Sequence, residues 1–202
     1  MTRAAPRAGL GLVAAVAFSA MAAAGPSAFH ASAPPAGVTG GFGEATCASC
    51  HIGSDVNAFG GRVRVEGLPT AYEPGDEYVL TVDLRADETA VAGFQLSARF
   101  SDGRRRGASA GALEPLDSRT AVADSVGVRY LHQTETGSRT ADASGGSWSF
   151  LWRAPMDGRS VVLHVAANSG NGDNSPLGDL VYTSVDTLPS SANRPHPSQR
   201  SP

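Results

Sequence analysis

Short runs of alternating apolar and polar residues dominate the chain from Gly61 to Val185. Successive side chains of a β-strand point to opposite faces, so each run has one apolar face that needs a second layer to cover it. Turn-forming residues separate the runs, and the chain holds 24 glycines and 13 prolines. No segment shows the 3.6-residue period of a long amphipathic helix. The runs cover residues 62–66, 78–84, 94–100, 126–130, 148–152, 161–166 and 180–185.

This pattern predicts an all-β fold, an antiparallel β-sandwich over residues 61–188. Hydrophobic residues make up 41% of the chain and charged residues 17%, which suits one buried core better than a disordered chain or a coiled coil. Trp148, Phe150 and Trp152 share one face of their run. We therefore expect the two indoles to fill the interior of the sandwich.

The two ends of the chain differ from this body in composition. Residues 1–24 are predicted to be a signal peptide, because Arg3 and Arg7 precede an uncharged, alanine-rich stretch that ends in small residues. A retained membrane anchor is the alternative, but a spanning helix needs about 20 strongly apolar residues. Residues 25–43 are expected to form a Gly/Pro-rich linker, and residues 189–202 a polar, disordered tail. We expect an exported protein, periplasmic or extracellular, without a stable membrane anchor after cleavage.

Charge and motifs argue against several function classes. The 16 basic and 19 acidic residues give a net charge of −3, and a net-acidic chain without a broad basic face is not typical of nucleic-acid binding. The run Arg104-Arg105-Arg106 is expected to be a solvated loop. The sequence contains no Ser-His-Asp arrangement, metalloprotease motif or phosphate-binding loop, so we expect no enzymatic activity.

The only two cysteines lie in one short motif, Cys47-Ala48-Ser49-Cys50-His51. C-x-x-C-H is the attachment pattern of c-type haem. Two thiols on one turn can form thioethers with the two vinyl groups of a single porphyrin, and the histidine after the second cysteine can bind the iron. We predict a haem-binding segment at residues 44–60, with covalent haem c on Cys47 and Cys50 and with His51 as the proximal ligand.

Other interpretations of the motif remain open. A Cys47–Cys50 disulfide is one, and the protein would then be a non-redox extracellular binding or adhesion module. A structural zinc site normally needs four ligands, and the sequence has no second Cys/His pair at a suitable spacing. The haem interpretation predicts an electron-transfer protein with an unidentified redox protein as its partner.

The sixth iron position has several candidate ligands. His132 is preferred, because it lies at a predicted strand end beside a polar loop. Met156, in a Pro-Met-Asp-Gly turn, would raise the potential, and His164 lies in an apolar strand. A vacant position or a ligand from a partner also remains open.

Several segments resemble the reelin-type (reeler) domain: residues 72–78, 93–97, 148–155, 166–168, 178–179 and 182–183. The bacterial exported branch known as the choice-of-anchor V group is most similar, because its members commonly carry a Gly-rich stretch and a C-x-x-C-H motif before the sandwich, as in residues 39–51. The resemblance covers about residues 37–188 and implies an immunoglobulin-like sandwich. It also implies that His132 matches a histidine that the family often has. In animals, reeler domains occur beside cytochrome b561 modules, and others act in matrix and adhesion.

Overall fold

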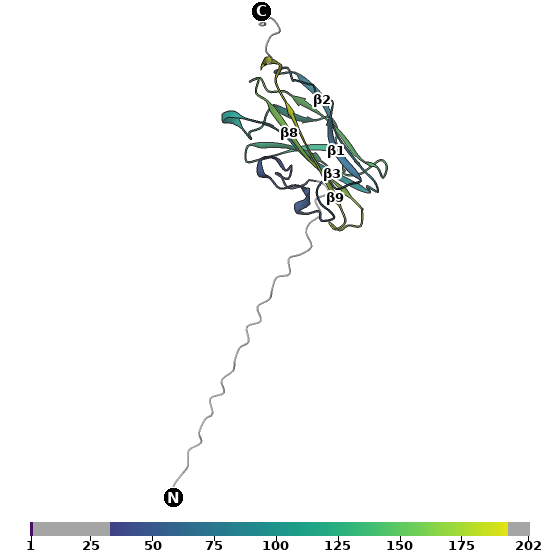
Figure 1. The fold of residues 1–202 in the computed structure, drawn as a ribbon. Helices are drawn as coiled ribbons and strands as arrows, with labels where there is room; N and C mark the ends of the chain where they lie inside the picture. The colour runs from purple at the N-terminus through teal and green to yellow at the C-terminus, as the bar shows by residue number, and fades with distance from the viewer. Residues whose placement is uncertain (2–32, 194–202) are drawn as a thin grey trace, which may run out of the picture.

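The computed structural model describes residues 33–193 together with Met1. Two antiparallel sheets pack face to face, as the ribbon in Figure 1 shows. The strands are β1 (Gly61–Glu66), β2 (Glu77–Ala86), β3 (Val91–Phe100), β4 (Ala112–Pro115), β5 (Thr120–Ser125), β6 (Val128–Gln133), β7 (Gly145–Arg153), β8 (Val161–Gly170) and β9 (Leu180–Leu188). Short 3-10 turns are η1 (Gly41–Gly43), η2 (Cys47–Ser49), η3 (Gly103–Arg105) and η4 (Ser191–Asn193). The predicted all-β antiparallel sandwich is confirmed.

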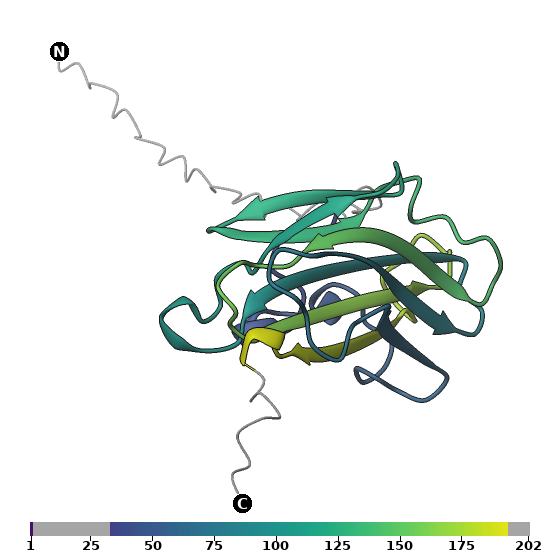
Figure 2. The same ribbon diagram turned by 90° about the horizontal axis from the view of Figure 1, so that it is seen from above.

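The strand order places the long strands at the centre of each layer. One sheet has four strands in the order β1-β2-β7-β4, and the other has five in the order β5-β6-β3-β8-β9. Figure 2 shows the same strands from above. In the five-stranded sheet, β3 pairs with β8 along its full length, from Val91 opposite Gly170 to Phe100 opposite Val161.

Alternate residues of the paired strands face the core between the sheets. Trp148 and Trp152 are both buried there, and each indole N–H donates to a backbone carbonyl, that of Gly137 and that of Ala110 respectively. A buried indole needs such an acceptor, because an unpaired N–H in an apolar interior is costly. The expectation that both tryptophans are core residues is confirmed.

The structure differs from the predicted strands between residues 112 and 130. It has β4 and β5 where the sequence indicated none, because these short strands carry few large apolar residues and are only partly buried. Val126 was expected to share a strand face with Val128 and Tyr130. Instead, Val126 and Gly127 have φ angles of 49° and 75° and form the two-residue turn between β5 and β6. A side chain at positive φ leaves the ladder, so Val126 is fully exposed.

The N-terminal part of the described chain packs on the sandwich. Residues 33–46, here called the strap, cross the outer face of the five-stranded sheet, and residues 47–51, here called the motif turn, follow at β8. Residues 52–60 then lie along the free edge of β9, where Asn57 exchanges hydrogen bonds with Thr183. The purple-to-blue start of the ribbon in Figure 1 lies against the sheets in this way. Part of the stretch expected to be a linker is therefore a packed layer.

Some sequence predictions concern residues outside this description. The signal peptide at residues 1–24, the first part of the linker and most of the tail after residue 193 lie outside the described residues. Within the described part of the chain, no helix is long and apolar enough to cross a membrane.

Candidate functional site

The motif turn presents both thiols and the imidazole from one short piece of backbone. The Thr46 hydroxyl accepts a hydrogen bond from the Ala48 N–H, which starts the turn η2. The carbonyl of Cys47 then accepts the N–H groups of both Cys50 (3.1 Å) and His51 (3.0 Å). These bonds hold the three functional residues of the motif within one compact turn.

The two cysteines are free thiols in different surroundings. Cys50 is exposed, whereas Cys47 is partly buried against the sandwich. Burial raises the pKa of the Cys47 thiol to about 12, since a thiolate is poorly solvated there. Cys47 is therefore a protonated thiol at neutral pH, and Cys50 is the more accessible of the two.

His51 is bound at one ring nitrogen by a carboxylate from the far end of the sequence. Its Nδ1 lies 2.6 Å from Oδ2 of Asp179, a residue 128 positions away. The Asp179 side chain is only 5% exposed and that of His51 35%. A carboxylate only accepts hydrogen bonds, so Nδ1 of His51 is the donor in this contact. Within residues 33–193, the His51 ring makes its hydrogen bond through Nδ1 and none through Nε2.

The loop before β9 is joined to the residue that follows the motif. The Ile52 N–H donates to the Pro176 carbonyl (2.7 Å), and the Gly178 N–H donates to the Ile52 carbonyl (2.8 Å). Ile52 and Leu177 form an isolated parallel bridge there, and both side chains are largely exposed. Two exposed apolar side chains thus lie on the backbone segments that lead to His51 and Asp179.

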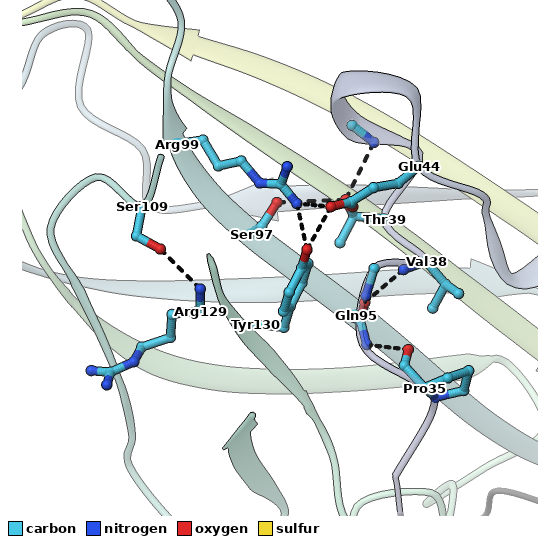
Figure 3. A network of polar contacts seen from close by, with 12 residues as sticks. Pro35, Val38, Thr39, Glu44, Gln95, Ser97, Arg99, Ser109, Arg129 and Tyr130 are labelled. Atoms are coloured by element: carbon cyan, nitrogen blue, oxygen red, sulfur yellow. Dashed lines mark hydrogen bonds and ion pairs between the residues drawn. The ribbon is translucent and has the colours of Figure 1, made fainter. Parts of the chain in front are cut away.

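The strap is held by a buried charged network, shown in Figure 3. Glu44 forms an ion pair with Arg99 of β3, and its carboxylate also accepts from the hydroxyls of Tyr130 (2.5 Å) and Thr39 (2.6 Å). Burial disfavours the charge of Glu44, but the hydrogen bonds from Arg99, Thr39 and Tyr130 outweigh it and lower the pKa of this carboxyl. Burial and the hydrogen bond to Glu44 raise the pKa of Tyr130 to about 12. Three side chains thus donate to the Glu44 carboxylate, while the buried Nε of Arg99 has no hydrogen-bond partner within the described residues.

Two further contacts fix the strap along the sheet. The Gln95 side chain accepts the N–H groups of Gly37 and Val38, both at 2.8 Å, and donates to the Pro35 carbonyl at 3.0 Å (Figure 3). A single amide from β3 thereby satisfies three backbone groups of residues 35–38, the part of the strap before its 3-10 turn.

The strap also covers His164 on β8. The Phe42 ring meets the imidazole edge-on, with ring centroids 5.3 Å apart. Gly41 lies so close that an added Cβ would stand 2.7 Å from the His164 Cγ. Within residues 33–193, the buried Nδ1 of His164 has no hydrogen-bond partner. Burial, followed by the positive charge of Arg99, lowers the pKa of His164.

The candidate sixth ligands lie at different places in the fold. His132 is on β6, two strands from β8 and so about 10 Å from it. It is 5% exposed, and its Nδ1 lies 2.7 Å from the Gln133 carbonyl. His164 lies on β8, the strand against which the motif turn packs. His132 is buried, whereas His164 is half-buried, as is His51.

Met156 lies far from the motif turn. It is in the connection before β8, whereas Asp179 binds the Asn171 N–H just after β8 ends. The ten residues of β8 separate these two ends by about 30 Å. The structure does not bring Met156 to the site, and it brings no group of three or more His, Cys, Asp or Glu side chains together as a metal site within the described residues.

The sequence did not reveal Asp179 as the partner of His51. No spacing rule links the loop before β9 to a motif more than a hundred residues earlier. Glu44, Arg99 and Tyr130 were missed for the same reason, since they come from separate parts of the chain.

The fold and the site define an antiparallel β-sandwich that carries a cysteine and histidine turn on its outer face. Three solved structures are similar in fold. The human F-spondin reeler domain is 21% identical with a TM-score of 0.47, covering 68% of this chain and 94% of that one. The Reelin-N domain of F-spondin is 19% identical with a TM-score of 0.47, covering 71% and 94%. A cohesin module of a Clostridium perfringens family 33 glycoside hydrolase is 12% identical with a TM-score of 0.43, covering 66% and 98%.

Comparisons of sequence gave no relative. No model of a protein family matches the chain, and no curated protein matches it.

Proposed function

We propose that this chain is an exported monohaem c-type cytochrome-like protein that transfers electrons. In this proposal Cys47 and Cys50 hold haem c and His51 binds the iron. The sandwich, of the reeler type and of the choice-of-anchor V group, carries the haem and docks a redox partner protein in the periplasm or outside the cell. The observation that carries the proposal is the motif turn, where one exposed thiol, one partly buried thiol and the imidazole of His51 lie together on one short piece of backbone.

The residues of the motif turn fit covalent haem. The Cys47 carbonyl holds the backbone of Cys50 and His51, so the thiols keep a short, defined spacing. Cys50 is exposed, and the exposed side chains of Ile52, which follows His51 in sequence, and Leu177 offer apolar surface on which a porphyrin edge can rest. Bound haem would supply a one-electron iron centre, while the protein sets its exposure and its ligands.

The proposal leaves two histidines and a vacant position as alternatives for the sixth position of the iron. His132 remains a candidate, but its ring is buried, so ligation would require movement of the chain that covers it. His164 is on the strand next to the motif turn and has an unpaired buried Nδ1. A second histidine would give a low potential, and a vacant position would leave the iron open to small ligands.

The test is covalent haem in the purified full chain, produced in a host with c-type maturation machinery. We expect c-type bands in the reduced spectrum and haem that stays attached after extraction with acidified acetone. The variant Cys47→Ala/Cys50→Ala should be folded and lack covalent haem. His132→Ala and His164→Ala, compared by their spin state, would identify the sixth ligand.

A folded but colourless wild-type chain would overturn the proposal. Thiol titration of that chain would then distinguish free cysteines from a Cys47–Cys50 disulfide. A disulfide would support the other prediction from the sequence, a non-redox binding or adhesion module.

A further inference from the structure

The contact between His51 and Asp179 is more constrained than a surface ion pair. Both carboxylate oxygens are used: Oδ2 faces Nδ1 of His51 at 2.6 Å, and Oδ1 accepts the Asn171 N–H at 3.1 Å. The Asp179 side chain is nearly buried, so water competes little for its oxygens. The carboxylate therefore has one orientation, and it gives the imidazole one orientation too.

The backbone on both sides holds this pair in place. Ile52, next to His51, makes two hydrogen bonds with the loop that leads to Asp179. At Gly53 an added Cβ would overlap the Asp179 carbonyl, so these two segments of the chain meet at a distance that only glycine permits. The motif and the loop before β9 thus form one unit, although they are far apart in sequence.

We propose that Asp179 is the positioning residue of the iron ligand His51. It keeps the proton on Nδ1, aims the free Nε2 away from the protein and makes the ring a stronger electron donor. This inference rests on the proposed haem site. A histidine ligand that donates its other N–H to a carboxylate is a better donor to the metal, so it stabilises the oxidised, more positive iron. Asp179 accordingly lowers the midpoint potential of the protein.

The decisive variant is Asp179→Asn in the full-length haem protein. The two donors face different oxygens of Asp179, and asparagine has an NH2 group in place of one of them, so only one of the two contacts keeps an acceptor. We expect haem to remain covalently attached and the midpoint potential to shift to more positive values. Asp179→Glu, which keeps the carboxylate, should restore at least part of the wild-type potential.

Asp173→Asn is the matched control, because it makes the same charge change in the same loop. The Asp173 side chain accepts from Asn171 and Ser175 and does not contact His51. The midpoint potential of the Asp173→Asn protein should stay close to that of the wild type. If Asp179→Asn and Asp173→Asn shift the potential equally, or if Asp179→Asn leaves it unchanged, Asp179 has only a structural role and the inference fails.

The failure of this inference differs from the failure of the haem proposal. If the wild-type chain is colourless, the haem proposal falls. Long-range 1H–15N spectra of that same chain then report the tautomer of His51. A proton on Nδ1 in the wild type and its loss in Asp179→Asn would support the positioning role, and the same tautomer in both would refute it.

Discussion

The strap and the motif turn are adjacent in sequence but are held in opposite ways. The strap is fixed by buried polar groups: Arg99 and Glu44 have side-chain exposures of 4% and 16%. In the motif turn, Cys50 is exposed and His51 is one-third exposed. The contacts of the strap fix its position on the sheet, whereas the motif turn leaves the Cys50 thiol and part of His51 accessible.

This difference has a physical consequence. A buried ion pair contributes little net stability compared with apolar packing, but it is highly sensitive to the loss of one partner. It also specifies a single arrangement, since Glu44 finds Arg99, Tyr130 and Thr39 at one place on the sheet. We infer that the strap is the anchor that keeps the motif turn at β8.

Removal of Glu44 should have the largest effect on stability. Glu44→Ala leaves the Arg99 guanidinium buried with one fewer partner, and we expect a loss of about 3 kcal/mol in the free energy of unfolding. Asp124→Ala, which breaks the exposed pair with Arg129, is the control and should cost about 0.5 kcal/mol or less. Urea unfolding measures both, and equal losses would contradict the anchoring role of the strap.

Gly41→Ala should disturb the strap by crowding. The added Cβ would meet the His164 ring at 2.7 Å, so we expect a loss of about 2 kcal/mol from overpacking. The double variant Gly41→Ala/His164→Ala should show positive coupling in a double-mutant cycle, because the smaller side chain removes the clash. Simple additivity would show that the strap lies elsewhere in solution.

Acid should destabilise the strap in two stages. The pKa of His164 is lowered below 6.5 by burial and by Arg99, so the unfolded state binds a proton that the folded state does not, and stability falls as pH falls below 6.5. The pKa of Glu44 is lowered below 4.5, so stability falls again below that value. Urea unfolding across both ranges should show His164→Gln flattening the first stage and Glu44→Gln the second. An unchanged pH profile in both variants would contradict these assignments.

The motif turn should give the smallest effect on stability. Cys50→Ser changes an exposed atom, so we expect less than about 0.5 kcal/mol in the free energy of unfolding. In the proposed haem protein the same change should abolish one thioether, which mass spectrometry of haem peptides detects. A large loss of stability without any effect on haem attachment would show that Cys50 has a structural role, contrary to the difference between the strap and the motif turn.

The fold was largely predictable because strands leave a local signal. Alternation identified the long strands, and the spacing of Trp148 and Trp152 identified core positions. The signal failed for β5, where Thr120–Ser125 is only partly buried and lacks large apolar residues. It also failed at Val126, whose positive φ is imposed by a two-residue turn that its own side chain disfavours.

The sequence predicted the motif of the candidate site but not the residues that hold it. The sequence by itself determined the motif, because two thiols and an imidazole within five residues stay close together in any fold. The tertiary structure alone decided that Asp179 binds His51, that Glu44 meets Arg99, and that the Gly/Pro-rich stretch before the motif packs on a sheet. Local patterns reflect the geometry of neighbouring residues, whereas these pairings depend on which sheet faces and loop ends the whole sandwich brings together.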